Sequence, residues 1–170
     1  MSSLPPPALR FHRTGSPLEV LQLESVPLRD PGEGEVTIRM LAAPINPADL
    51  NIIEGKYGLQ PSLPAVPGNE GVGVVEQAGS GVTGLRTGDR VVLGSGIGTW
   101  CERCVAPASE LLRVPDSIPV EQAAMLRVNP PTAWLMLREF VALNAGDWVI
   151  QNAANSAVGR AVIAIARAHG

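Results

Sequence analysis

The chain has 170 residues, of which 45% are hydrophobic and 17% charged, and this composition is typical of a globular protein. At this length it can bury one good core or one and a half smaller ones. A formal net charge of −3 argues against a basic face that would bind nucleic acid. The sequence contains no run of about eighteen apolar residues, so we expect no membrane-spanning helix.

The first fifteen residues bear on location. They lack the apolar core of a signal peptide, and the prolines at positions 5 to 7 oppose an amphipathic transit helix. We therefore expect a cytoplasmic protein with no membrane and no nucleic acid among its partners.

Glycine and proline, 18 and 16 in number, separate short apolar runs before residue 100. This punctuation favours a β-rich first part. The runs expected to form strands are Leu18–Leu28, Val36–Ala42, Gly71–Ala78, Arg90–Leu93, Trp100–Ala106 and Leu111–Val114. In the second run apolar and polar residues alternate, which predicts one buried face.

An irregular segment, residues 44–70, lies between these strands and is rich in turn-forming residues. Long irregular segments inside compact domains usually carry function. Within the segment we expect a short helix at Pro47–Gly55, because Ala48, Ile52 and Ile53 share one helical face.

After Val120 the composition shifts to Ala, Leu and Val with helical periodicity. The shift predicts two domains of different class, residues 1–125 and 126–170.

The second domain has the pattern that begins a dinucleotide-binding fold. We expect a helix at Thr132–Leu143, a buried strand at Trp148–Asn152, a turn of small residues at Ala153–Ala157 and then a second helix. In such a unit a diphosphate is held at the N-terminus of the helix that follows the turn.

Two interpretations of this turn are open. Ala154, Ser156 and Gly159 occupy the glycine positions of G-x-G-x-x-G, so the generic fingerprint is weak. Asn155 and Ser156 can donate hydrogen bonds to a phosphate, or they can cap a turn that binds nothing.

The two cysteines, Cys101 and Cys104, form a CxxC pair. A structural zinc site would need two more ligands, yet the only histidines, His12 and His169, stand near opposite ends of the chain. We therefore expect free thiols and no metal.

Three motifs resemble the medium-chain dehydrogenase/reductase superfamily: Pro67–Val75, Gly79–Val82 and Gly88–Val91. The resemblance extends over residues 18–170. It implies a mixed fold, in which a GroES-like β-barrel is followed by the first part of a Rossmann α/β nucleotide-binding domain.

The resemblance also bears on zinc. Zinc alcohol dehydrogenases of this superfamily have a Cys ligand at the position of Asn46 and a His-Glu pair at Asn69-Glu70. An amide is a poor zinc ligand, so these departures favour the zinc-free reductases.

Further segments resemble one zinc-free branch, the mitochondrial-type trans-2-enoyl thioester reductases. The matching runs are Ala43–Asp49, Gly55–Gly58, Leu63–Val66, Gly98–Trp100, Val128–Ala133 and Val149–Ser156. This resemblance implies NADPH-dependent reduction of the 2,3-double bond of trans-2-enoyl thioesters in fatty acid synthesis. It also implies enoyl-CoA or enoyl-acyl carrier protein as substrate, and a homodimer as the complete protein.

The resemblance assigns roles to single residues. Tyr57, the only tyrosine, is implied as the proton donor, while the residue alone also allows a loop tyrosine that packs by its ring. Asn46 is a candidate for orienting Tyr57 or the cofactor. The implied cofactor contacts are Asn129, Asn155, Ser156, Ala157 and Val158.

Two other functions stay open, a zinc-free quinone oxidoreductase and a non-catalytic barrel fragment or interaction module. The second arises because about 45 residues follow the barrel, whereas a doubly wound domain needs roughly 100 or more. We therefore expect an open strand edge at Val149–Gln151, and no turnover by these 170 residues alone.

Overall fold

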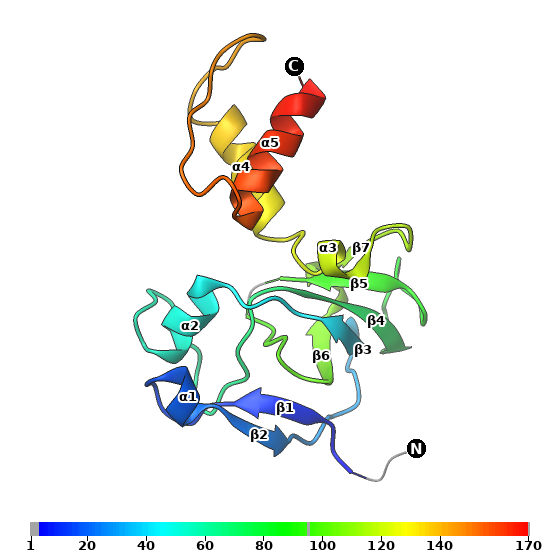
Figure 1. Cartoon of the computed structure of the whole chain (residues 1–170). Helices are drawn as coiled ribbons and strands as arrows, with labels where there is room; N and C mark the ends of the chain where they lie inside the picture. The colour runs from blue at the N-terminus through cyan, green and yellow to red at the C-terminus, as the bar shows by residue number, and fades with distance from the viewer. Residues whose placement is uncertain (1–3, 95, 170) are drawn as a thin grey trace. The chain divides into compact units, whose positions relative to one another are not determined.

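Figure 1 shows the computed structural model, which describes residues 4–94 and 96–169. The chain divides into two compact units, the first ending at Ala124 and the second beginning at Met125. Within the described ranges all the strands belong to the first unit, and the second consists of two helices with their connecting loops.

A five-stranded antiparallel sheet forms the centre of the first unit. In spatial order its strands are β6 (Arg103–Pro107), β3 (Glu35–Ala42), β4 (Gly71–Ala78), β5 (Arg90–Leu93) and β7 (Leu112–Arg113). Their inward faces are rich in β-branched residues, which fit a pleated, half-buried surface. The main core cluster includes Val36, Ile38, Val75, Val91 and Leu93. The sheet is not closed into a barrel among the described residues, because β6 and β7 remain its edges.

The remaining elements of the first unit are short. They are β1 (Pro7–Arg10), α1 (Pro17–Val20), β2 (Gln22–Ser25), α2 (Pro47–Ile53), the 3-10 helix η1 (Ala108–Glu110) and α3 (Val120–Ala123). β1 and β2 pair as a separate antiparallel sheet. A second buried cluster is formed by Phe11, Val20, Ile53 and Ala65. This cluster anchors the C-terminal end of α2.

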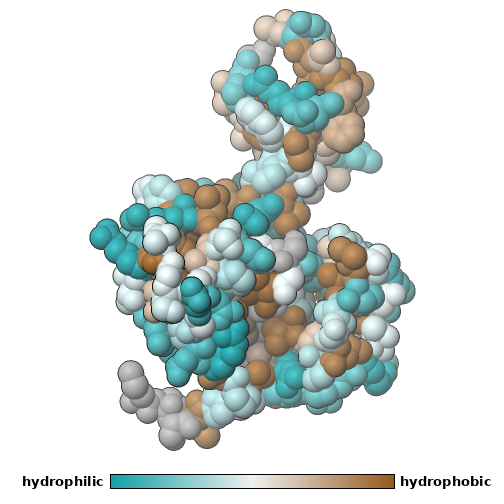
Figure 2. Space-filling model, turned by 180° about the vertical axis from the view of Figure 1, so that it is seen from behind, coloured by the Kyte–Doolittle hydropathy of each residue, from teal (hydrophilic) through white to brown (hydrophobic). Residues whose placement is uncertain are grey.

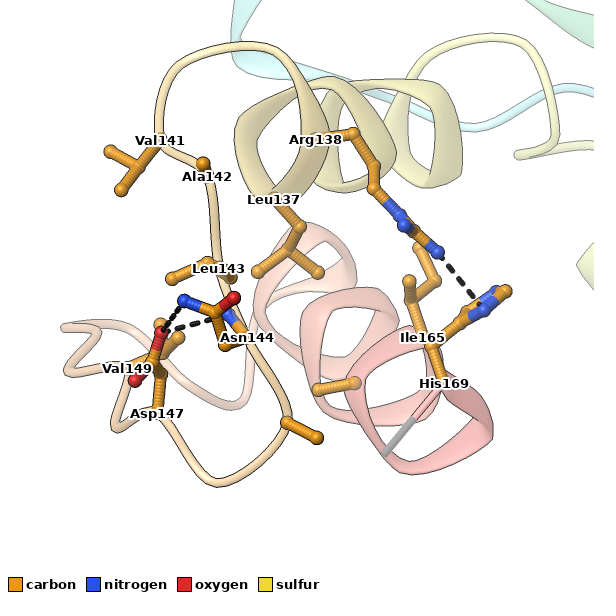
Figure 3. Close-up of a pocket in the computed structure, with 12 residues that line it drawn as sticks. Leu137, Arg138, Val141, Ala142, Leu143, Asn144, Asp147, Val149, Ile165 and His169 are labelled. Carbon is orange, nitrogen blue, oxygen red and sulfur yellow. Dashed lines mark hydrogen bonds between the residues drawn. The ribbon is translucent and has the colours of Figure 1, made fainter.

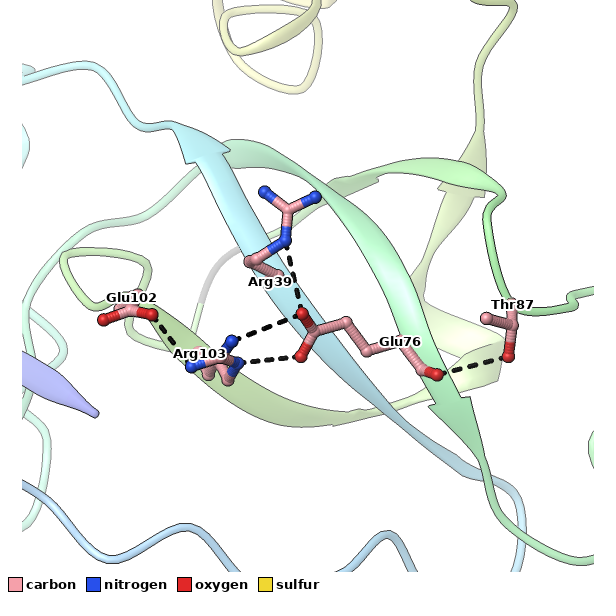
Figure 4. A network of polar contacts seen from close by, with 5 residues as sticks. All are labelled: Arg39, Glu76, Thr87, Glu102 and Arg103. Carbon is pink, nitrogen blue, oxygen red and sulfur yellow. Dashed lines mark hydrogen bonds and ion pairs between the residues drawn. The ribbon is translucent and has the colours of Figure 1, made fainter. Parts of the chain in front are cut away.

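An ion-pair network ties the strands of the large sheet together (Figure 4). The Glu76 carboxylate on β4 pairs with Arg39 Nε of β3 at 3.2 Å and accepts a hydrogen bond from Arg103 Nε of β6 at 2.8 Å. The Thr87 hydroxyl donates to the Glu76 carbonyl oxygen at 3.2 Å. One carboxylate therefore links three strands.

In the second unit, α4 (Asn129–Arg138) and α5 (Ala157–His169) pack against each other. The Trp134 ring meets the His169 ring edge-on, with centroids 5.2 Å apart, and the Arg138 guanidinium lies 4.9 Å from the centre of the Trp134 ring. These aromatic and cation–π contacts add to the packing of the helix pair.

Several expectations from the sequence are confirmed. Strands occur at Glu35–Ala42, Gly71–Ala78 and Arg90–Leu93, and the short helix of the irregular segment is α2. The helix expected at Thr132–Leu143 lies instead at Asn129–Arg138. It begins earlier because its prolines fall in the first turn, where no intrahelical N–H bond is lost, and it ends five residues before Leu143.

The expectation of one strand over Leu18–Leu28 is wrong. Pro17 opens a helical turn in which the Val20 N–H donates to the Ser16 carbonyl at 3.1 Å, and β2 begins only at Gln22. The fixed φ of proline suits the first position of a helix.

The expectation of a buried strand at Trp148–Asn152 is also wrong. Trp148 and Ile150 are 95% and 97% exposed, and the segment is irregular. A strand needs a neighbouring strand to pair its N–H and C=O groups, and the described part of the second unit offers none. The open edge expected at Val149–Gln151 is therefore absent from the described structure.

Candidate functional site

Tyr57 lies just beyond α2. Hydrogen bonding continues past the helix, since the Lys56 N–H donates to the Asn51 carbonyl at 2.8 Å. The Tyr57 carbonyl accepts a bond from the Gln60 side-chain nitrogen at 2.8 Å, and Tyr57 is 45% exposed. The backbone at Tyr57 is thus held on both sides while its side chain is accessible.

Two carboxylates are buried at the other end of α2. Asp49 and Glu70 are each 1% exposed. The Asn46 backbone N–H donates to Asp49 Oδ2 at 2.7 Å, and its side-chain nitrogen donates to Glu70 Oε1 at 2.9 Å. Asp49 Oδ1 accepts from the Asn69 backbone N–H and side-chain nitrogen at 3.0 and 2.6 Å. We call these four residues the amide–carboxylate cluster.

The cluster offsets a large desolvation cost. Buried carboxylates are stable only when hydrogen-bond donors replace the water that they lose. Sequence reasoning identified Asn46 and Asn69, beside Glu70, as departures from a zinc site and assigned no role to Asp49. The signal was an acidic residue three positions after an N-cap residue, which is typical of a capping box.

The turn before α5 lies so close to the first turn of the helix that Gly159, the third residue of α5, must be glycine. The Gly159 N–H donates to Ser156 Oγ at 3.0 Å, which caps the start of the helix. A Cβ at Gly159 would lie 2.7 Å from the Ala153 carbonyl oxygen. The helix start, where free N–H groups and the helix dipole favour an anion, holds Asn155, Ser156, Ala157 and Val158.

Asn129 begins α4 in the same unit. Its side-chain nitrogen is buried and has no hydrogen-bond partner within the described structure. An unsatisfied buried donor of this kind costs about 1–3 kcal/mol. The amide is therefore suited to an acceptor on a bound molecule.

A hollow of about 260 Å³ is lined by the C-terminal ends of α4 and α5 and by the loop of residues 141–149, as Figure 3 shows. Ile165 and His169 line it from the C-terminal end of α5, roughly 15 Å along the helix from the turn. This hollow is therefore separate from the predicted cofactor contacts.

A larger hollow, about 610 Å³, lies in the first unit and is lined by Leu9, Met40, Ile45, Leu50 and Trp100 among others. Figure 2 shows hydrophobic surface gathered in the hollowed middle of this unit. Tyr57 is not among the residues that line it.

Cys101 and Cys104 are free thiols, and a hydrogen bond joins their side chains. The bond lowers the pKa of Cys101, whereas the same bond together with burial raises the pKa of Cys104. Within residues 4–94 and 96–169 there is no group of three or more His, Cys, Asp or Glu side chains that could hold a metal ion. Nor does any helix in those ranges have the length and apolar character needed to cross a bilayer.

The structure brings four of the predicted site residues together at the start of α5, and Asn129 lies in the same unit at the start of α4. Tyr57 belongs to the other unit.

The chain is similar to a known domain family, to curated reductases and to solved structures. Residues 32–116 match the family model of the alcohol dehydrogenase GroES-like domain. A curated relative, the mitochondrial enoyl-[acyl-carrier-protein] reductase of Xenopus tropicalis, is 51% identical over 170 residues, which is 99% of this chain and 49% of the relative. The chain thus spans about half the length of the curated relatives it matches.

Solved structures agree. The Etr1p/NADP/crotonyl-CoA complex matches with a TM-score of 0.86 and 32% identity over 92% of this chain and 50% of the other. The mitochondrial 2-enoyl thioester reductase Etr1p/Etr2p heterodimer from Candida tropicalis matches with a TM-score of 0.87 and 32% identity over 94% and 50%. A quinone oxidoreductase of Pseudomonas syringae pv. Tomato DC3000 matches with a TM-score of 0.84 and 34% identity over 96% and 50%.

These matches confirm the expected mixed fold, a GroES-like domain followed by the start of a Rossmann domain. They contradict the expected cytoplasmic location, because the relatives are mitochondrial proteins. The prolines that argued against a transit helix directly precede or begin strand β1, which starts at Pro7. They reflect a folded strand, and therefore carry no information on targeting.

Proposed function

The chain belongs to the alcohol dehydrogenase GroES-like domain family, and on this premise we propose that it is the N-terminal part of an NADPH-dependent enoyl thioester reductase. The observation that carries the proposal is the 51% identity to an enoyl-[acyl-carrier-protein] reductase along 99% of this chain. The proposed reaction reduces the 2,3-double bond of a trans-2-enoyl thioester.

This reduction needs a hydride at the β-carbon and a proton at the α-carbon. When bound, NADPH supplies the hydride, which no side chain can provide. Tyr57 is the proposed proton donor, since a neutral phenol has an O–H whose proton can be delivered to the α-carbon, leaving the phenolate. Its exposed side chain on a backbone held by Gln60 and Asn51 supports this role.

The proposed cofactor contacts fit such a ligand. Asn155, Ser156, Ala157 and Val158 would hold phosphate at the start of α5, where N–H groups have no partner within the helix. Asn129 would donate its otherwise unpaired side-chain nitrogen to an acceptor on the nicotinamide side.

The reaction is proposed to proceed without zinc. The side-chain nitrogens of Asn46 and Asn69 each donate to a buried carboxylate. An amide is a poor zinc ligand beside thiolate or imidazole, so these two residues do not supply the ligands of a zinc dehydrogenase.

We propose enoyl-CoA or enoyl-acyl carrier protein as the substrate, in line with the crotonyl-CoA bound to Etr1p and the substrate named for the Xenopus relative. A dimer is proposed for the complete protein, and the Etr1p/Etr2p heterodimer supports it.

The second candidate is a quinone reductase, favoured by the 34% identity to the Pseudomonas syringae enzyme. NADPH oxidation by the complete protein, measured with crotonyl-CoA and with a quinone, separates the two. Faster turnover of the quinone would replace the proposed substrate class.

The role of Tyr57 is tested by Tyr57→Phe in the complete protein. We expect kcat to fall about 100- to 10,000-fold, the usual contribution of a general acid, while the Kd for NADPH stays nearly constant. Stopped-flow reduction of crotonyl-CoA and a fluorescence titration with NADPH measure the two quantities. Unchanged kcat would exclude Tyr57 as the donor.

That residues 1–170 alone do not turn over substrate stays a prediction, and NADPH oxidation by this chain with crotonyl-CoA would contradict it. A fluorescence titration of the chain with NADPH tests the argument from an incomplete nucleotide-binding domain, which micromolar binding would overturn.

A further inference from the structure

We propose that Asn46 is a positioning residue for Tyr57, acting through α2 and the amide–carboxylate cluster. The proposal rests on the proposed function for its consequence in catalysis, and on the contacts of the first unit for its mechanism.

Asn46 connects α2 to the central sheet. Its side-chain nitrogen donates to Glu70, the residue directly before β4, at 2.9 Å. Its backbone N–H donates to Asp49 in the first turn of α2 at 2.7 Å. One residue thus bridges two buried carboxylates that come from different parts of the fold.

Glu70, which Asn46 contacts on the side of the sheet, is firmly held. β4 pairs with β3 and β5, and the Thr99 hydroxyl donates to the Glu70 carbonyl oxygen at 2.8 Å. Glu70 is therefore held at both its backbone and its side chain, and a helix tied to it is tied to the centre of the sheet.

From Asn46 to Tyr57 the backbone is hydrogen-bonded almost without a break. α2 rises about 10 Å over its seven residues. The Gly55 N–H then donates to the Ile52 carbonyl at 3.0 Å and Lys56 to Asn51 at 2.8 Å. A rotation or shift at the start of α2 is therefore carried to Tyr57.

The buried side chain of Ile53 is a second anchor of α2, through its apolar cluster with Phe11, Val20 and Ala65. An apolar cluster resists separation but is non-directional, whereas hydrogen bonds define orientation. The cluster around Asn46 therefore sets how the helix is turned, and with it the direction in which Tyr57 leaves the helix.

Because Tyr57 is the only tyrosine, incorporation of 3-fluorotyrosine gives a single ¹⁹F resonance that reports on this residue. We compare the 170-residue chain with Asn46→Ser and Asn46→Ala. Serine is also a good N-cap and keeps the backbone N–H to Asp49, but its short side chain loses the bond to Glu70. We expect the resonance to shift by more than its linewidth in both variants.

The matched control is Ile38→Val, a loss of one methylene in the buried core of the sheet. It should lower the unfolding midpoint and leave the resonance within its linewidth. An unmoved resonance in folded Asn46→Ser, or an equal shift in the control, overturns the proposal. If Asn46→Ala does not fold, Asn46→Ser decides.

In the complete protein Asn46→Ser should lower kcat about 10- to 100-fold with a KM changed less than about twofold, the pattern of a misplaced donor. The ¹⁹F measurement does not depend on activity. If Tyr57→Phe retained full turnover, the proposed function of Tyr57 would fail while the positioning of its ring remained separately measured.

Discussion

Single residues of the first unit carry measurable charge effects, and Glu35 is the clearest. Arg29 Nη2 donates to Glu35 Oε1 at 2.6 Å, and the Gly32 N–H donates to Oε2 at 2.9 Å. The bond from Arg29 has the largest effect, and together with the bond from Gly32 it lowers the pKa of Glu35 from 4.5 to about 2. The folded state therefore favours the ionised carboxylate.

A pKa lowered by folding predicts a loss of stability in acid. The contribution of Glu35 is fully present above pH 4.5 and is lost as the pH falls towards 2. Glu35→Gln should therefore flatten the decline in the free energy of unfolding across this range. Urea titrations at several pH values measure it. Glu110→Gln, at a residue with no ion pair among the described residues, removes the same charge and is the matched control.

At the scale of elements, the close packing of β4 against its antiparallel neighbour β3 requires a glycine at position 73. A Cβ at Gly73 would lie 2.4 Å from Ile38 Cγ2 and 2.7 Å from the Arg39 carbonyl oxygen. The neighbouring strand cannot yield without breaking its own pairing with β4 and β6.

Gly73→Ala should therefore destabilise the first unit by about 1–3 kcal/mol, as overpacked cores usually do. The midpoint of chemical denaturation measures the loss. Gly58→Ala is the matched control, because nothing lies within 4 Å of a Cβ at that position. Equal midpoints for the two variants would contradict the packing argument.

At the scale of the whole molecule, the two units differ in how much apolar surface they bury. The first has two buried clusters, whereas in the second Phe140, Trp148 and Ile150 are 78%, 95% and 97% exposed. Apolar surface left in water contributes no stability, so the second unit should open more easily.

Hydrogen exchange tests this difference. We expect the amides of residues 148–151 to exchange about a thousandfold faster than those of β4, because a folded domain is worth at least about 5 kcal/mol. Mass spectrometry of peptides, produced after exchange in the intact chain, measures the exchange rates of residues 148–151 and of β4. Equal protection would mean that Trp148–Gln151 is a hydrogen-bonded strand after all.

Local sequence patterns were sufficient to predict several helices and strands of the first unit. Alternation predicted β3, the glycine-spaced apolar run predicted β4, and three apolar residues on one face predicted α2. β1 was missed because its first residue is proline, which a strand tolerates at its start. For the site, the motif at Asn155-Ser156 predicted a turn at a helix start, where Ser156 does cap α5.

By itself, the sequence determined the alternating strands, the small-residue turn and the family to which the chain belongs, because these depend on residues near one another along the chain. Only the tertiary structure decided that Asn46, Asp49, Asn69 and Glu70 form one buried cluster, since hydrogen bonds across 20 and 24 residues leave no local periodicity. Only the tertiary structure, likewise, decided that Trp148–Asn152 is irregular. The β-propensity of a segment becomes a strand only when a neighbouring backbone takes its hydrogen bonds.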